Sequence, residues 1–258
     1  MRKALLQDFI VPICRADILP HKARLTRLEG TAFFINDRGV FLTAGHVIRS
    51  IQATSNETHI GYGVNVKAND SAGTNAFVRL VEFEHAPSPF DVAIGKVDFI
   101  SRSWFSVYSG AKIEGWKDVA TLGYPQSALD PDPERFRIHL RSLKGHVQRA
   151  IGADELPAHR PHPDCFELNF AITNGLSGAP LFITRRDVQE LIAICVYSVD
   201  SEVVIDSLTE IHDDGSRFEE RRSRVEQYGI AHSLLPLMDW KPAILKGMSL
   251  RDAISPND

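Results

Sequence analysis

The chain has 258 residues, of which 43% are hydrophobic, so it can bury the core of one large domain or of two smaller packed subdomains. Because 29 basic and 33 acidic residues leave a net charge of −4, with no basic run interleaved with aromatics, we expect no nucleic-acid partner. No stretch approaches the roughly 18 apolar residues of a membrane span, and no leader-type cleavage site follows the N-terminus. We therefore expect no membrane partner and a cytoplasmic protein.

Six short segments rich in β-branched and aromatic residues occupy the first half of the chain, separated by Gly, Pro, Asn and Asp. This pattern is typical of an all-β sandwich or barrel protein. The predicted strands are Leu5–Cys14, Thr31–Ile35, Val40–Thr43, Thr58–Val66, Ala76–Glu84 and Val92–Val97. We expect them to close into a six-stranded antiparallel barrel over residues 1–105, because closure removes exposed strand edges.

A second set of about six strands is predicted within residues 106–258 and is expected to form a second antiparallel barrel. These strands are Val119–Gly123, Phe136–Gln148, Cys165–Phe170, Pro180–Thr184, Leu191–Ser198 and Tyr228–Ala231. The segment Phe99–Lys117 is expected to connect the two barrels. The charged segment Asp206–Glu226 predicts an exposed hairpin or a mobile loop. A C-terminal helix is predicted over Ser233–Gly247, although Pro242 interrupts it.

Three residues in separate segments carry distinctive local sequence. Ser177 lies between two glycines in the stretch NGLSGAPLF, where glycine permits unusual backbone angles and close approach of a ligand. His46 comes just past a predicted strand, in TAGHV, among small residues. Asp91 opens DVAIGKV, a strand expected to be buried, so its carboxylate needs a partner.

Together these side chains supply what a serine nucleophile requires. An alcohol attacks poorly at neutral pH, so an imidazole must take its proton, and a buried carboxylate must orient that imidazole and stabilise its protonated form. Backbone N–H groups of Gly175 and Ser177 would face the developing oxyanion, each worth roughly 3 to 4 kcal/mol in well-studied cases. We therefore expect Ser177, His46 and Asp91 to form a catalytic triad, with Gly175 and Ser177 as the oxyanion hole.

The motifs TAGHV, DVAIGKV and NGLSGAPL, in the order His, Asp, Ser, resemble the active-site motifs of trypsin/chymotrypsin-like serine peptidases, in their disulfide-free bacterial branch. GTAFFI at residues 30–35 and LGYP at residues 122–125 resemble two further motifs of that branch. The resemblance runs from about residue 5 to about residue 240. It implies a chymotrypsin-like fold, a serine endopeptidase with an acyl-enzyme intermediate, a protein or peptide substrate, and no cofactor.

The resemblance also implies a specificity pocket. Ala171 would lie at its base, and Cys195, Val196, Tyr197 and Ser198 would form one wall and pair with the substrate backbone. None of these residues is charged, so the predicted P1 residue is uncharged and of small to medium size. Leu176 replaces the Asp or Asn that relatives carry before the serine. It leaves open an oxyanion loop that stays collapsed until a substrate or a regulatory partner arrives.

Other readings of the same residues remain open. The chain could be a peptide-binding module that keeps the fold and cleaves nothing, or cleaves only with a partner. An esterase on the α/β-hydrolase fold is disfavoured, because that fold orders its triad Ser, Asp, His. His146, His159, His162 and Cys165 could ligate zinc, but intervening prolines favour a loop with incidental histidines, and we expect no metal. Three widely spaced cysteines predict no disulfide framework.

Overall fold

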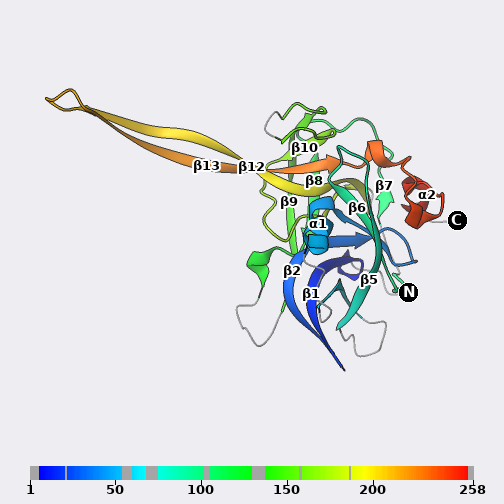
Figure 1. The fold of residues 1–258 in the computed structure, drawn as a ribbon. Helices are drawn as coiled ribbons and strands as arrows, with labels where there is room; N and C mark the ends of the chain where they lie inside the picture. The colour runs from blue at the N-terminus through cyan, green and yellow to red at the C-terminus, as the bar shows by residue number, and fades with distance from the viewer. Residues whose placement is uncertain are drawn as a thin grey trace.

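The structure is a computed structural model that describes residues 6–20, 22–53, 60–67, 75–101, 105–129, 137–156, 159–185 and 187–254. Two β-sheets make up the body of the molecule, and a long two-stranded arm leaves it on one side (Figure 1). The chymotrypsin-like, all-β fold expected from the sequence is confirmed. No helix in the described ranges is long and apolar enough to cross a membrane.

The first sheet is a closed barrel of six antiparallel strands in the order β1-β2-β3-β6-β5-β4. The strands are β1 (Ile10–Leu19), β2 (Lys22–Phe34), β3 (Val40–Ala44), β4 (Ile60–Lys67), β5 (Asn75–His85) and β6 (Val92–Val97). All of β3 and nearly all of β6 are buried, which explains why these strands read as continuous apolar runs. A 3-10 turn (Leu6–Asp8) occupies part of the first predicted strand, and predicted strand residues 5 and 58–59 lie outside the described residues.

The second sheet has seven strands in the order β11-β8-β9-β10-β13-β12-β7. They are β7 (Ser106–Val107), β8 (Asp118–Gly123), β9 (Arg141–Ile151), β10 (Cys165–Leu168), β11 (Pro180–Arg185), β12 (Val188–Ile211) and β13 (Arg217–Ser233). Because β11 also pairs with β12, the pairings of six strands run round in a ring. The seventh strand, β7, pairs in parallel with β12 from the segment expected to be a connector.

Two short helices and several 3-10 turns complete the fold. Helix α1 (Gly45–Ala53) begins directly after β3. The helix predicted over Ser233–Gly247 is wrong, because the chain forms two 3-10 turns there, Leu235–Leu237 and Ala243–Leu245, before the five-residue helix α2 (Leu250–Ile254). Two prolines account for this, since Pro236 is the second residue of the first turn and Pro242 directly precedes the second.

The two sheets meet across an apolar interface. Phe105, from the link between the sheets, packs its ring edge-on against Phe9 and Phe33 beside the first barrel and contacts Phe182 of β11. One continuous core cluster therefore includes residues of both sheets and of the C-terminal turns. This shared core fixes β3 and β6 of the first sheet relative to β11 and β12 of the second.

Strands β12 and β13 continue well beyond the body as an antiparallel hairpin, which we call the arm and define as residues 200–227 (Figure 1). Nearly all its residues are exposed. The segment Asp206–Glu226, predicted to be either an exposed hairpin or a mobile loop, is therefore an exposed hairpin.

Candidate active site

The junction of β3 and α1 holds His46 against Asp91, which directly precedes β6. The Gly45 N–H donates to the Asp91 carbonyl at 3.0 Å, and the His46 N–H donates to Asp91 Oδ1 at 2.8 Å. His46 Nδ1 lies 2.6 Å from Asp91 Oδ2, so Nε2 of the same ring is left for another partner. A side chain at residue 45 would not fit, because a Cβ there would lie 2.7 Å from Asp91 Oδ1.

The Asp91 carboxylate also receives a bond from Arg49, one helical turn after His46. Arg49 lies 2.5 Å from Oδ1, on the same face of α1 as the imidazole. Burial alone would raise the pKa of Asp91, but hydrogen bonds and charge from His46 and Arg49 outweigh burial and lower it to about 2. Sequence analysis missed Arg49, because its i, i+3 spacing from His46 has meaning only on a helix that was not predicted.

A second histidine, His232 of β13, approaches Asp91 from the other sheet. Its Nδ1 accepts the Asp91 backbone N–H at 3.2 Å, which places the ring proton on Nε2. The ring is 2% exposed, and Nε2 has no partner among the described residues. Burial lowers the pKa of His232 to about 4, so the ring is neutral at physiological pH. No local pattern marks this histidine in the sequence.

The loop that carries Ser177 has backbone angles that require glycine on both sides. Gly175 has φ +93° and Gly178 has φ +89°, values that favour glycine. A Cβ on Gly178 would lie 2.1 Å from the Thr31 carbonyl and 2.9 Å from the Ala44 nitrogen. The serine loop therefore rests directly on the chain two residues before His46, which brings the three predicted residues to one place.

Thr31 of β2 holds this loop through both its backbone and its side chain. Its N–H donates to the Ser177 carbonyl at 2.9 Å, and its hydroxyl donates to the Gly175 carbonyl at 2.7 Å. The same hydroxyl accepts the Tyr124 N–H at 2.9 Å. Thr31 thus ties the first barrel to two loops of the second sheet. Sequence analysis placed Thr31 in a strand motif and did not assign it this role.

The two predicted oxyanion donors are unpaired in the described part of the chain, since neither the Gly175 N–H nor the Ser177 N–H donates to a protein group. The peptide before Gly175 is fixed, because the Gln126 N–H donates to the Asn174 carbonyl at 2.7 Å. In a trans peptide the N–H points opposite to the carbonyl, so the Gly175 N–H points away from Gln126. Leu176, the unusual residue before the serine, is buried with 1% exposure.

The Ser177 hydroxyl itself donates to the carbonyl of Val196 at 3.0 Å. Val196 lies at a β-bulge between Cys195 and Tyr197, where β12 shifts register against β13, so its carbonyl is not taken up by that ladder. Among the bonds of the described residues, Ser177 and His46 share none. The scaffold thus brings the serine loop to the backbone just before His46, but the Ser177 hydroxyl bonds to Val196 and not to the imidazole.

Two of the four predicted pocket-wall residues, Cys195 and Val196, have buried side chains, and the other two are partly exposed. The prediction for Cys195 is corrected, because its side chain is 0% exposed and its N–H and carbonyl both bond to the serine loop, at Ala179 and Gly178. Burial raises the pKa of its thiol to about 12, so it is inert. Val196 has a buried side chain and contributes its carbonyl.

The other predicted wall residues lie farther along β12. Tyr197 is half-buried, stacks on His159 and meets His232 edge-on. Ser198 fastens the neighbouring segment, since its hydroxyl accepts the Ile172 N–H at 2.7 Å and donates to the Ile172 carbonyl at 3.2 Å. Ala171, the predicted pocket base, directly precedes this fastened residue and is half-buried.

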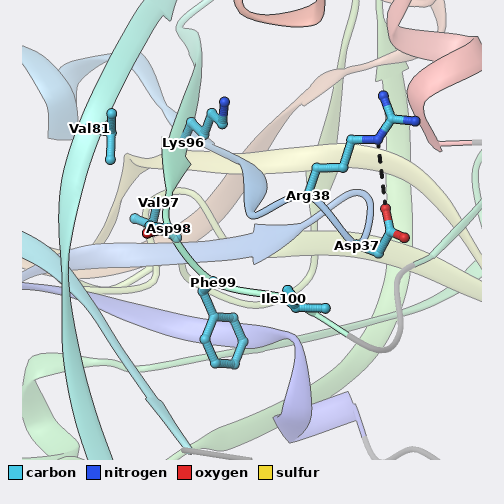
Figure 2. Close-up of a pocket in the computed structure, with 8 residues that line it drawn as sticks. All are labelled: Asp37, Arg38, Val81, Lys96, Val97, Asp98, Phe99 and Ile100. Atoms are coloured by element: carbon cyan, nitrogen blue, oxygen red, sulfur yellow. Dashed lines mark ion pairs between the residues drawn. The ribbon is translucent and has the colours of Figure 1, made fainter.

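Two of the surface hollows in the described structure are lined by residues other than Ser177. One, of about 290 Å³, borders Arg49, Asp91 and Phe90. The larger, of about 530 Å³, is lined by Asp37, Arg38, Val81, Lys96, Val97, Asp98, Phe99 and Ile100, with Asp37 and Arg38 ion-paired at its rim (Figure 2). Asp37 and Arg38 precede β3 whereas His46 follows it, so this hollow is at the opposite end of that strand.

Of the four alternative zinc ligands, His162 and Cys165 approach each other, with 3.8 Å between Nδ1 and Sγ, but no third joins them within the described residues. Within the described residues no group of three His, Cys, Asp or Glu side chains could hold a metal ion. Both ring nitrogens of His162 are occupied, because Nε2 accepts the Leu156 N–H and Nδ1 faces the Pro163 carbonyl, each at 2.8 Å. His146 stacks on Trp116, and Cys165 is a free, buried thiol.

Comparison with known proteins agrees with this fold. A family model described as a trypsin-like peptidase domain matches residues 30–194. The solved structure of Deg5 is similar at TM-score 0.52 and 15% identity, covering 74% of this chain and 79% of that one. The HtrA-type protease AlgW is similar in its decapeptide complex (TM-score 0.52, 15% identity) and its tripeptide complex (0.53, 17%). These cover 88% and 93% of this chain but only 61% of each AlgW chain. No curated protein sequence matches significantly.

Proposed function

The chain belongs to the trypsin-like peptidase family, and we propose that it is a serine endopeptidase in which Ser177, His46 and Asp91 act as the catalytic triad. The contact of the serine loop with the backbone before His46 carries this proposal, because it brings the nucleophile's loop to the imidazole that Asp91 orients. Asp91 stays ionised at neutral pH, as the proposed role requires.

In the proposed reaction, the Ser177 oxygen attacks the carbonyl carbon of the scissile peptide while His46 Nε2 takes the hydroxyl proton. The N–H groups of Gly175 and Ser177 hold the oxyanion. His46 then gives its proton to the leaving amine, and an acyl-enzyme remains on Ser177. Water, deprotonated by the same imidazole, releases the acid and restores the serine.

The resting bond of Ser177 to Val196 adds a step before the attack. The hydroxyl must leave the Val196 carbonyl and turn to His46 Nε2. An extended substrate that pairs with β12 would offer a backbone N–H to the same carbonyl, so substrate binding would compete for it and release the hydroxyl. We propose that pairing with the wall Val196–Ser198 accompanies this release.

We propose a preference for an uncharged P1 residue of small to medium size. Ala171 and the neighbouring Ile172 present no charge at the predicted pocket base. A buried Lys, Arg, Asp or Glu of the substrate would have nothing there to balance it. N-terminal sequencing of the fragments from a peptide library, with Ser177→Ala as the control, measures this preference directly.

Labelling by an organophosphonate probe tests the nucleophile. The wild-type chain is expected to be labelled at Ser177, and Ser177→Ala is expected to lose both labelling and turnover while keeping its circular dichroism spectrum. Ser198→Ala is a matched control, because its hydroxyl bonds to Ile172 and takes no part in the proposed chemistry. Equal labelling of the wild type and Ser177→Ala would overturn the assignment.

A second candidate is a peptide-binding module that is gated by a partner or does not cleave. The bond from Ser177 to Val196 favours it, since the hydroxyl is not engaged with the base. Incubation with an unfolded protein such as casein separates the two functions. Saturable binding without cleavage, in a chain whose Ser177 reacts with no probe, would support the binding module, whereas cleavage that Ser177→Ala abolishes supports the peptidase.

A further inference from the structure

The arm exposes apolar side chains that the body of the protein does not cover. Seven of its large hydrophobic residues are at least 44% exposed: Val203, Val204, Ile205, Leu208, Ile211, Phe218 and Val225. An isolated two-stranded hairpin is at best marginally stable in water. A hairpin whose strands extend about 40 Å beyond the sheet, at ~3.3 Å per residue, therefore needs a surface that covers one of its faces.

The register of the two strands assigns their side chains to two faces. Cross-strand partners share a face, successive residues alternate, and the bulge at Ile205 resets the alternation. One face, which we call the Leu208 face, carries Val203, Asp206, Leu208 and Glu210 from β12 and Phe218, Glu220, Arg222, Arg224 and Glu226 from β13. The opposite face, which we call the Ile211 face, carries Val204, Ile211 and Val225 among polar residues.

The charges of the Ile211 face are largely satisfied within the arm. Arg221 pairs with Glu219 at 2.7 Å, Gln227 donates to Asp200 at 3.0 Å, and Ser223 donates to Glu202. Arg217 alone among the arginines of this face makes no ion pair within the described residues. This face therefore offers little unpaired charge to a partner.

At one position along the arm, the Leu208 face carries an acidic and a basic side chain that form no ion pair with another described residue. Asp206 and Arg222 are register partners, so they lie directly across from each other, yet no ion pair joins either to another described residue. The acidic residue is on β12 and the basic residue is on β13. Leu208 and Phe218, at 50% and 52% exposure, lie on the tip side of this pair.

We propose that a second copy of this chain covers the Leu208 face with its own Leu208 face, the two arms lying parallel about a two-fold axis that runs along them. Rotation about such an axis puts β12 of one copy over β13 of the other. Asp206 then faces Arg222 of the partner subunit, and Arg222 faces the partner's Asp206, at the same level. At the levels nearer the tip, Leu208 faces the partner's Glu220 and Glu210 faces the partner's Phe218, so Leu208 and the partner's Phe218 lie diagonally across the interface.

Charge disfavours the other two-fold arrangements that bring β12 against β12. An axis across the arms puts β12 over β12, and edge-to-edge pairing joins two β12 strands or two β13 strands. Between residues 200 and 211, β12 has four acidic residues and no basic one, so like charges would meet in each β12 pairing. Only the parallel arrangement places acidic β12 against the arginines of β13.

The interface is modest in size. A face about 40 Å long and two strands, or about 10 Å, wide gives an interface of about 800 Å² in total, below the roughly 1,200 Å² of interfaces that hold stable dimers. Glu210 and Glu220 add negative charge to the same face and oppose the stacking. We therefore expect a dimer that dissociates on dilution and forms as concentration rises.

Sedimentation velocity of the full chain over a concentration series tests the proposal. Arg222→Asp is expected to weaken association about tenfold or more, because each of two reciprocal charge pairs becomes a repulsion. Asp206→Arg is expected to do the same. The double variant with both substitutions restores opposite charges across the axis, so its association is expected to return close to that of the wild type.

Arg217→Asp is the matched control, since it makes the same charge change on the Ile211 face. It is expected to leave association within about twofold of the wild type. A wild-type chain that stays monomeric at every concentration would overturn the proposal, and so would equal weakening by Arg217→Asp and Arg222→Asp. Failure of the double variant to recover would exclude the parallel arrangement. None of these outcomes bears on peptidase activity, which is measured separately.

Discussion

The two sides of the candidate active site differ in how completely the fold assembles them. On the first-barrel side, His46 and Asp91 are joined by a 2.6 Å contact, and backbone bonds hold both residues. On the second-sheet side, the backbone of the serine loop is equally fixed, but the hydroxyl of Ser177 donates to Val196. Backbone contacts therefore hold both sides in place, and the proposed mechanism requires the Ser177 side chain to turn from Val196 toward the imidazole.

This contrast has a physical origin. The imidazole has a charged acceptor in Asp91, and an ionised partner makes a stronger hydrogen bond than a neutral carbonyl does. The Ser177 hydroxyl exchanges one neutral acceptor, the Val196 carbonyl, for another, the imidazole nitrogen, so the two positions differ by little free energy. In the proposed reaction, substrate binding can therefore shift the Ser177 hydroxyl from Val196 to His46, whereas the bond between His46 and Asp91 is already formed without substrate.

Removing the charge of Asp91 is expected to have the largest effect on the His46–Asp91 side of the site. Asp91→Asn is expected to lower kcat/KM for a peptide substrate by about 10⁴-fold, because a neutral amide neither fixes the reactive tautomer nor stabilises the imidazolium. Steady-state kinetics with a substrate from the library screen measure the loss. Ser177 labelling should fall in parallel, and a loss smaller than tenfold would mean that Asp91 does not orient the base.

Displacing the Gly175 peptide is the corresponding test of the serine side. Gly175→Ala places a Cβ 2.3 Å from the Tyr124 carbonyl at a φ of +93°, so the loop must shift. Loss of one oxyanion donor is expected to lower kcat by about 10² to 10³-fold with a smaller change in KM. Gly215→Ala, also at positive φ but with nothing within 4 Å of its Cβ, controls for backbone strain alone. Equal losses in both variants would contradict the assignment.

Local sequence patterns located the three proposed catalytic residues, because each depends on its immediate neighbours. The glycines beside Ser177 are needed by the loop's own backbone angles, and His46 and Asp91 flank strands that read clearly as buried. The barrel strands were predicted for the same reason. The predicted C-terminal helix failed because proline geometry outweighed apolar periodicity.

Residues that act through long-range contacts left no local signal. His232 reaches Asp91 across 141 positions, and Thr31 reaches Gly175 across 144. The bulge that frees the Val196 carbonyl depends on the register of β12 against β13, which one strand's sequence does not determine. Cys195 was assigned to the pocket wall for its position along the strand, but the alternation of strand side chains turns it into the core.

The pH dependence of stability tests the contact between His232 and Asp91, on the His46–Asp91 side of the site. Because burial depresses the pKa of His232 in the folded chain, the unfolded chain takes up its proton first. The contribution of His232 to the free energy of unfolding is therefore fully present above about pH 6.5, and it is lost as the pH drops from 6.5 toward 4. A pKa of about 4 against the usual 6.5 corresponds to roughly 3 kcal/mol of unfolding free energy.

His232→Asn is expected to remove this dependence, because the amide oxygen can still accept the Asp91 N–H and does not titrate. Urea unfolding at a series of pH values measures the difference between the two proteins. The contribution of Asp91, whose pKa is lowered to about 2, is lost only as the pH falls below about 4, and both proteins should keep it. An unchanged slope between pH 4 and 6.5 would show that His232 is not the group responsible.

Thr31 joins the two sides, and its loss is expected to have the smallest effect of the four. Thr31→Val removes the hydroxyl that bonds the Gly175 carbonyl and the Tyr124 N–H, but keeps the backbone bond to Ser177. Two backbone groups then lose a partner at a buried site, so the free energy of unfolding should fall by about 2 kcal/mol. The kcat should fall by about tenfold, because Gly175 is less firmly placed.

Thr43→Val is the matched control, since its equally buried hydroxyl bonds only the Thr31 carbonyl. It should cost about 1 kcal/mol and leave kcat nearly unchanged. If both variants lowered kcat equally, general loosening of β2 and β3 would explain the loss, and the Thr31 hydroxyl would have no separate role in placing the oxyanion donor.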